Sequence, residues 1–264
     1  MKDEPELIHQ SLLADWQKAD AVRTFLLPCL DFHLTNGQVR KEGLSEFDRK
    51  LQQYGKKWLH LPQRASPEVL YIPTSHGGLG FSKLNDLSNT CKIAYAQTVL
   101  NSEDKLVQNI AYTDAIKAVK RRLKKNPSNL EITEYFDGKT DGIFDCNSSD
   151  VSSNWTKLRI ATRRLRTKLL VNWKINNDGA LGITQNGNHI KPNKTKRTLR
   201  GAIAAHEMKN LRDKPDQGRI FDVSMIRNSS NHYLSRGDFI RFADWRFIHK
   251  ARLNVLQLNG CRRQ

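Results

Sequence analysis

Residues 44–58 read LSEFDRKLQQYGKKW, and the spacing of their apolar side chains decides which fold class to expect. The apolar positions follow one another at intervals of three and four residues: Leu44, Phe47, Leu51, Tyr54 and Trp58. Such intervals place side chains on one face of an α-helix, here over about four turns. We therefore predict an amphipathic helix that Pro62 terminates and whose apolar face helps to build a core.

Other segments carry similar helical signals. We predict helices over about 12–26, 86–100, 102–125, 201–211 and 238–256, with Pro28 marking a kink or an end of the first. Val69–Ile72 is a short β-prone run, and Asn186-Gly187 is a strong signal for a two-residue hairpin. The predicted fold class is mainly α: a helical N-terminal region and then a basic, α-rich domain with a small β-hairpin.

A compositional change marks the expected domain boundary. Residues 126–153 are rich in Asn, Ser, Asp and Gly, a composition typical of loops between domains. We therefore predict a helical region over 1–125, a loop or linker over 126–153, and a basic domain over 154–264.

The charge of the chain is strongly positive and unevenly distributed. The 264 residues include 44 Lys+Arg and 27 Asp+Glu, a formal net charge of +17. Residues 1–100 contribute only +1, whereas residues 151–212 hold 14 basic and 2 acidic residues, or +12. A concentration of this kind favours RNA or DNA as the partner, rather than a small-molecule substrate.

The basic segment begins with NWTKLRIATRRLRTKLLVNW (154–173), which we predict to be one helix. Trp155 and Trp173 then share its apolar side, and basic residues flank or oppose them. The predicted nucleic-acid-binding residues are Arg159, Arg163, Arg164, Arg166, Lys168, Lys174, Lys191, Lys194, Lys196, Arg197 and Arg200. The alternative is a solvated basic face with no ligand.

Several classes of protein are excluded or disfavoured. No apolar run approaches the roughly 18 residues that a membrane-spanning helix needs. The acidic start MKDEPEL lacks the apolar core of a secretory signal, so we expect an intracellular protein. The cysteines, Cys29, Cys91, Cys146 and Cys261, are too widely spaced for a CxxC pair, and a disulfide framework is not expected.

Catalytic and metal-binding motifs are incomplete. The phosphate-binding GxxxxGK[ST] pattern is absent. His206-Glu207 opens like a zinc-protease HExxH, but Asn210 stands where the second histidine is needed, so we interpret the segment as ordinary helix surface. Phe242-Ala243-Asp244 is similar to a polymerase metal-binding hairpin, but Trp245 replaces the second carboxylate. We predict no catalytic residue, no metal ligand and no cofactor for this chain.

Four segments, taken together, resemble a known family: LLADWQKADAVRTFLLPCLDF (12–32), KKWLHLPQRASPEVLYIPTSHGGLGF (56–81), DKPDQGRIFDV (213–223) and SRGDFIRFADWRFIHKARLNVLQLNG (235–260). They are similar to the polyproteins of non-LTR retrotransposons, of the site-specific type that inserts into ribosomal RNA genes. The resemblance extends over nearly the whole chain. The positions that match its motifs are Lys56, Lys57, Trp58, Leu61, Pro62, Gly77, Gly78, Gly80, Pro215, Asp216, Gln217, Gly218, His249, Lys250 and Arg252.

This resemblance implies a fold and a place in a longer protein. Residues 1–125 would be the end of the palm and the helical thumb of a reverse transcriptase, and the rest a linker. The palm carboxylates, the CCHC zinc knuckle and the endonuclease of the family have no counterpart here, so Mg and Zn would belong only to the missing parts. We expect a non-catalytic, nuclear fragment of an RNA-directed DNA polymerase that binds RNA or an RNA/DNA duplex. The alternatives are a mis-predicted exon of an intact reverse transcriptase and a domesticated nucleic-acid-binding module.

Overall fold

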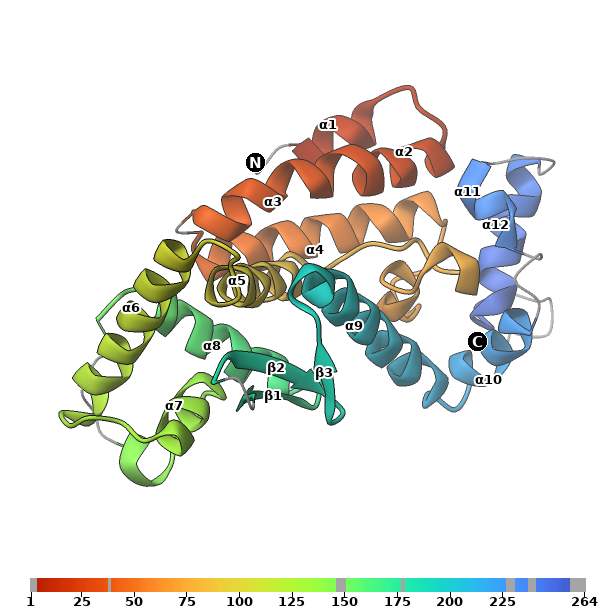
Figure 1. The fold of residues 1–264 in the computed structure, drawn as a ribbon. Coiled ribbons are helices and arrows are strands. Elements are labelled where there is room, and N and C mark those ends of the chain that lie inside the picture. Colours follow the sequence, from red (N-terminus) through yellow and green to blue (C-terminus); the bar gives the residue numbers. More distant parts are fainter. Residues whose placement is uncertain are drawn as a thin grey trace. The chain divides into compact units, whose positions relative to one another are not determined.

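The chain folds mainly into helices, accompanied by one antiparallel sheet (Figure 1). The computed structural model describes residues 4–37, 39–145, 151–176, 179–226, 231–236 and 241–256. Its α-helices are α1 (Glu4–Gln10), α2 (Asp15–Ala21), α3 (Leu27–Asn36), α4 (Lys41–Trp58), α5 (Leu84–Leu100), α6 (Lys105–Leu123), α7 (Asn129–Phe136), α8 (Asn154–Arg166), α9 (Thr195–Arg212), α10 (Gln217–Met225), α11 (Tyr233–Arg236) and α12 (Phe242–Arg252). The predicted mainly α class is confirmed.

Shorter elements complete the architecture. A π-helical turn, η1 (Val22–Leu26), precedes α3. The 3-10 helices are η2 (Pro67–Leu70), η3 (Thr74–His76), η4 (Gly142–Phe144) and η5 (Pro192–Lys194). The strands are β1 (Val171–Ile175), β2 (Leu181–Gln185) and β3 (Asn188–Ile190), paired in the order β1-β2-β3.

The chain divides into two units that are not consecutive in sequence. Unit 1 comprises residues 1–32, 38–85 and 204–264, and unit 2 comprises residues 33–37 and 86–203. The predicted ranges 1–125, 126–153 and 154–264 differ from this division, because 86–125 and 154–203 belong to one unit. The core of unit 2 explains the difference, since α5, α6, α7, α8 and the sheet all contribute side chains to it.

Unit 1 contains the predicted amphipathic helix as α4. Leu44, Phe47, Leu51 and Trp58 are all buried, as their spacing predicts. The Asp48 carboxylate on the same helix accepts a hydrogen bond of 2.7 Å from the backbone N–H of Leu84. Helix α4 therefore both fills the core of unit 1 and satisfies an otherwise free donor at the start of α5.

Pro28, predicted to mark a kink or an end of the first helix, is the second residue of α3. The π-turn η1 precedes it, and the backbone N–H of Leu27 bonds to the carbonyl of Val22, five residues earlier. A proline has no N–H and its ring crowds the preceding turn, so a locally wider turn lets the helical path continue. The chain then runs on as α3.

The run Val69–Ile72, predicted as a strand, instead belongs to η2 and the residues after it. The backbone N–H groups of Leu79, Gly80 and Phe81 donate to the carbonyls of Val69, Ile72 and Leu70, at 2.8–3.1 Å. The polar backbone groups are thus satisfied by the turn that follows, so no partner strand is needed.

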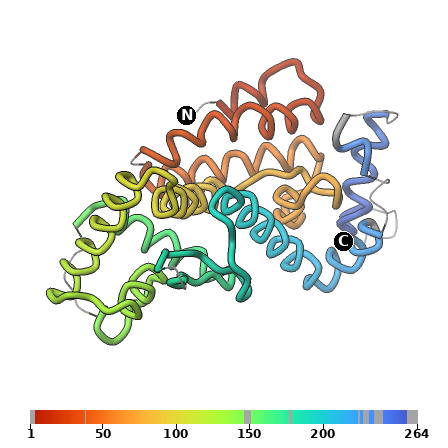
Figure 2. The backbone as a smooth tube through the Cα atoms, in the orientation of Figure 1, coloured from red at the N-terminus to blue at the C-terminus, as the bar shows by residue number. Residues whose placement is uncertain are grey.

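Residues 126–153, predicted as a loop, contain helix α7. Ser128 caps its first turn, accepting from the backbone N–H of Glu131 while the Glu131 carboxylate accepts from the backbone N–H of Ser128. Ile132, Tyr135 and Phe136 are buried in the core of unit 2. The polar composition concealed this short apolar face; in Figure 2 the tube forms the coil of α7 in the yellow-green part of the chain. Residues 146–150 of the predicted loop lie outside the described residues.

The predicted helix over 154–173 is wrong in its second half. Helix α8 ends at Arg166, and Val171–Ile175 form strand β1, whose Val171 pairs with Gln185 and whose Ile175 pairs with Leu181. Trp173 is buried in the strand, with its indole N–H donating to the Thr162 hydroxyl at 3.1 Å. Val and Ile favour strands, and a partner strand decides the choice here.

The predicted hairpin is confirmed at Asn186-Gly187. Both residues have positive φ angles, 50° and 82°, as a two-residue turn between antiparallel strands requires. Gln185 pairs with Asn188 across the turn, which fixes the register of β2 with β3.

Candidate nucleic-acid interface

Arg159, the first of the predicted binding residues, is a core residue. Its side chain is only 6% exposed, with the guanidinium 4.9 Å from the Tyr135 ring centroid and 5.8 Å from that of Phe144. It also donates a hydrogen bond of 2.5 Å to the carbonyl of Lys139. The prediction that Arg159 faces phosphates is therefore wrong: a position at the edge of an apolar stripe becomes buried when α7 and η4 cover it.

Two more predicted residues are occupied by internal partners. Arg166 donates to the Asp137 carbonyl at 3.1 Å and lies 3.9 Å from its carboxylate. Lys168 forms an ion pair with the buried Asp86, with N···O distances of 2.7 and 2.8 Å. Burial raises the pKa of Asp137, although the Trp173 N–H and Arg166 oppose this. Arg166, the last residue of α8, and Lys168, two residues further on, thus connect this segment to other parts of unit 2.

The remaining predicted cations mostly lie at the surface of unit 2. The exposed ones are Arg163 and Arg164 on α8, Lys174 on β1, and Lys191, Lys194, Arg197 and Arg200 around the start of α9. Lys196 is partly buried. They are distributed over a helix, a strand and the start of a second helix of unit 2, and of these cations Lys191 and Lys194 line a common pocket.

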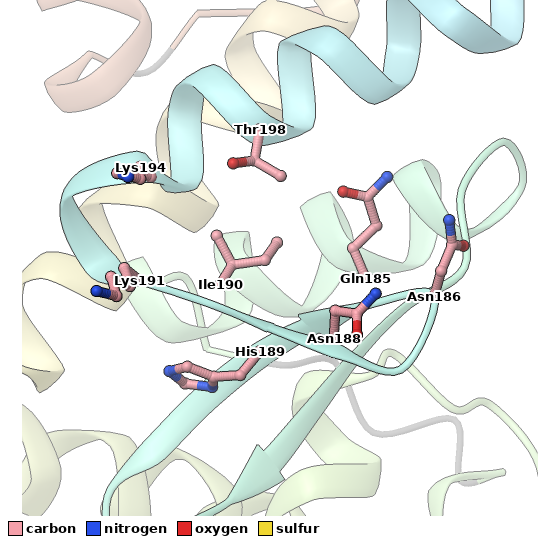
Figure 3. Close-up of a pocket in the computed structure, with 8 residues that line it drawn as sticks. All are labelled: Gln185, Asn186, Asn188, His189, Ile190, Lys191, Lys194 and Thr198. Carbon is pink, nitrogen blue, oxygen red and sulfur yellow. The ribbon is translucent and has the colours of Figure 1, made fainter.

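A pocket lies where the hairpin meets the start of α9 (Figure 3). Its volume is about 390 Å³, and its lining residues are Gln185, Asn186, Asn188, His189, Ile190, Lys191, Lys194 and Thr198. In Figure 3 the side chains of Gln185, Ile190 and Thr198 lie between the hairpin and α9. Amides donate and accept hydrogen bonds, and lysines attract phosphates, so this lining suits an unpaired nucleotide.

The sequence-based prediction named Lys191 and Lys194, which line this pocket, as nucleic-acid-binding residues, but it missed the amides of Gln185, Asn186 and Asn188. It also missed Lys92 of α5, which belongs to the nearly neutral first hundred residues yet lies near Lys157 and Arg164 of α8. A signal for the amides was present, because three of them surround the Asn186-Gly187 turn. No comparable signal marked Lys92, whose neighbours come from a distant segment.

The motif residues all belong to unit 1, where several of them form hydrogen bonds with other segments of that unit. The Gln217 side chain accepts from the backbone N–H of Ser66 at 2.7 Å and donates to the carbonyl of Arg64 at 3.3 Å. Beside it, Lys214 pairs with Glu68 at 2.8 Å. Burial opposes ionisation of Glu68, but hydrogen bonds from Lys214 and Ser66 prevail and lower the pKa of its carboxyl. Gln217 therefore has a structural role in this network.

A second group of motif residues surrounds a buried aromatic cluster. The indole N–H of Trp245 donates to the carbonyl of Trp58 at 3.1 Å. His249 is buried, with its ring centroid 4.6 Å from that of Trp245 and 5.7 Å from that of Tyr233. Burial, and then the charges of Arg252 and His60, lower the pKa of His249 to about 3. His249 thus packs as a neutral ring.

The remaining motif positions also shape unit 1. Gly77 and Gly80 have φ angles of +90° and +69°, and a Cβ on Gly78 would lie 2.2 Å from the Ile72 carbonyl oxygen. Of the others, Leu61 and Gly218 are buried. The Lys56 ammonium donates to the Gln63 carbonyl, Lys57 lies over the Tyr54 ring, and Arg252 lies over the Tyr233 ring. Pro62 and Lys250 are partly exposed, and Pro215 and Asp216 are exposed. These contacts explain the motifs as determinants of the fold.

The His206-Glu207 segment is not an ordinary helix surface. Glu207 is only 2% exposed and forms an ion pair of 2.6 Å with Lys83, whose ammonium lies 4.5 Å from the Tyr71 ring centroid. Among the residues that the structure describes, no three His, Cys, Asp or Glu side chains gather in a way that could hold a metal ion. In the same ranges, no helix has both the length and the apolarity to cross a membrane.

Fold and surface together define a mainly helical protein with a cationic surface on one of its two units. No protein-family model matches the chain. The chain is similar to the uncharacterized protein T26G10.4 of Caenorhabditis elegans, at 26% identity over 274 residues, which covers 97% of this chain and 78% of that protein.

Proposed function

We propose that the chain binds RNA, alone or paired with DNA, through the exposed cations of unit 2. The observation that carries the proposal is that Lys191 and Lys194 line the same pocket as the amides of Gln185, Asn186 and Asn188. Lysines and arginines neutralise phosphates, and amides can hydrogen-bond to the edges of unpaired bases. Arg163, Arg164, Lys174 and Arg200 add positive charge to the same unit.

We further propose that the chain is a non-catalytic part of a non-LTR retrotransposon reverse transcriptase polyprotein. The support is the sequence resemblance of its four motif segments, which correspond to the thumb and linker of that family. Their residues pack together in unit 1, as expected of segments that maintain one fold. In the parent protein such a piece would hold template RNA or the RNA/DNA duplex while other domains perform the chemistry.

Fluorescence anisotropy with a labelled RNA hairpin and a matching RNA/DNA duplex, across a salt series, tests RNA binding. The affinity is expected to fall steeply between about 50 and 200 mM salt, because phosphate contacts release counterions. Replacing both Lys191 and Lys194 with Glu should weaken binding by about tenfold or more and reduce the salt slope by about two. An affinity that does not respond to salt, or no binding at low salt, contradicts the proposal.

A double replacement of the same charge provides the matched control. Lys120 and Arg121 are exposed on α6 of unit 2. They are far from the hairpin in sequence, and neither lines its pocket. Their replacement by Glu changes the net charge equally. A loss of affinity equal to that of the pocket variant would show that binding depends on net charge alone and not on the proposed surface. Duplex DNA, as a competitor, tests whether the preference is for RNA.

A further inference from the structure

Two cations of unit 2, Lys92 and Lys157, line one hollow, and the positive charge of Arg164 also acts on Lys92. Lys92 comes from the middle of α5, and Lys157 and Arg164 come from α8. Burial, and after it the positive charges of Arg164 and Lys157, lower the pKa of Lys92. Within the described ranges none of the three forms an ion pair with a carboxylate, and the group that acts in the opposite direction is the Cys91 thiol.

A small hollow, with a volume of about 20 Å³, lies beside Lys92 and Lys157. Lys92 and Lys157 line it together with Tyr95, which lies almost one helical turn after Lys92 on α5. Thr35 and Asn154 contribute polar groups, and the buried Ala96 and Trp155 also line it. The Tyr95 side chain is 40% exposed, so its ring is accessible from solvent.

The arrangement is unfavourable for the free protein. Like charges held close together repel one another, and partial burial of Lys92 removes some of the water that would screen them. Elsewhere in unit 2 a comparable cation is compensated: Lys168 has Asp86. No carboxylate among the described residues pairs with Lys92, Lys157 or Arg164, so a bound anion would relieve the repulsion.

We propose that Lys92, Lys157 and Arg164 bind a phosphate group of a nucleic-acid strand, and that the neighbouring base stacks on Tyr95. Multiple cations match the charge of a phosphate, and an exposed aromatic ring accepts any base face. The proposal rests on the proposed function, since it identifies a subsite for the strand that the hairpin surface also contacts. It adds single-stranded character to the ligand, because a stacked base must be unpaired.

The first experiment measures the affinity of a labelled single-stranded RNA for the whole chain and for Lys92→Gln, across a salt series. The variant should bind about three- to tenfold more weakly near 100 mM salt, with a salt slope reduced by about one. Lys157→Gln should act in the same direction and covers the case in which the Lys92 variant does not fold. Lys120→Gln, an exposed change of equal charge on α6, should leave the affinity within about twofold of the unsubstituted chain.

The second experiment separates base stacking from phosphate binding. Tyr95→Ala should weaken binding of the ordinary strand by about fivefold or more, and binding of an abasic strand by less than twofold. Inorganic tripolyphosphate serves as a ligand without bases. It should raise the midpoint of thermal unfolding of the unsubstituted chain, and raise it less in Lys92→Gln.

The outcomes distinguish the two proposals. If Lys191→Glu/Lys194→Glu weakens RNA binding but Lys92→Gln and Lys157→Gln do not, the subsite is wrong and the proposed function stands. If no RNA binds but tripolyphosphate stabilises the chain through Lys92, these cations bind free phosphates, and both the nucleic-acid ligand and the proposed function are wrong. If Lys92→Gln responds to tripolyphosphate as fully as the unsubstituted chain, the phosphate site itself is overturned.

Discussion

Gln217 and Ser66 lie 151 positions apart in the chain, and the backbone N–H of Ser66 donates a hydrogen bond of 2.7 Å to the Gln217 side chain. The bond links the segment before η2 to the start of α10. Because Ser66 is buried, its N–H cannot turn to water if the acceptor is removed. One side chain therefore ties the early and late segments of unit 1 together.

Replacing Gln217 with Ala is expected to lower the free energy of unfolding by about 1–3 kcal/mol, because it leaves a buried donor unsatisfied. Urea denaturation followed by circular dichroism measures this. Gln53→Ala, at an exposed position of α4, is the matched control and should change stability by less than about 0.5 kcal/mol. Equal effects in both variants would contradict the structural role of Gln217.

The neutral, buried His249 predicts that stability decreases in acid. Its pKa is about 3 in the folded chain, against an ordinary histidine value of 6.5, so the unfolded chain binds more protons between these pH values. The stability associated with this residue is complete above about pH 6.5 and is lost progressively as the pH falls toward 3. Its contribution to the slope approaches about 1.4 kcal/mol per pH unit.

His249→Gln removes the titrating ring, so the comparison is between pH slopes rather than absolute stabilities. Urea denaturation at several values between pH 7 and pH 5 should give a shallower slope for the variant than for the unsubstituted chain. If the two slopes coincide, His249 is not held neutral in the folded state.

Replacing glycine with alanine is predicted to change stability in opposite directions at two positions, Gly187 and Gly43. A Cβ added to Gly187 or to Gly43 would meet no atom within 4 Å, but Gly187 has a φ of +82° whereas Gly43 lies inside α4. Gly187→Ala should therefore destabilise the chain by about 1 kcal/mol through backbone strain. Gly43→Ala should stabilise it by about 0.5–1 kcal/mol through helix propensity. Thermal unfolding measures both, and equal signs would contradict the turn geometry.

Because Arg159 is buried, we predict that replacing it lowers the stability of the chain without changing its affinity for RNA. Arg159→Lys keeps the charge but loses the planar group that lies over Tyr135 and Phe144 and bonds to the Lys139 carbonyl. The free energy of unfolding should fall by about 1–2 kcal/mol. RNA affinity, measured on the fraction that is folded, should stay within about twofold. A large loss of affinity would instead place Arg159 in the binding surface.

The sequence predicted features that depend on local chemistry. The spacing of Leu44, Phe47, Leu51 and Trp58 identifies α4, because period and burial agree over four turns. The Asn186-Gly187 pair identifies the hairpin, because few residue pairs accept two positive φ angles. In both cases the decisive neighbours are close in sequence.

Features that depend on distant partners were not predictable in the same way. Trp173 continues the apolar arc of α8 on a helical wheel, and only pairing with β2 makes its segment a strand. Arg159 looks exposed until Tyr135 and Phe144 cover it. Lys92 carries no local sign of a binding site, because its companions Lys157 and Arg164 come from α8. The sequence therefore indicated which types of residue form the candidate site, but only partly which positions they occupy.

The division of the chain into interleaved units has a consequence for how it folds during synthesis. Unit 2 ends at residue 203, so all of its parts have been made before the last part of unit 1. The hydrogen bond between Ser66 and Gln217 can form only after residue 217 has been synthesised, and the one between Trp58 and Trp245 only after residue 245. The early segments of unit 1 are thus made well before residues 217 and 245, and until those residues follow, part of their packing is incomplete and open to aggregation.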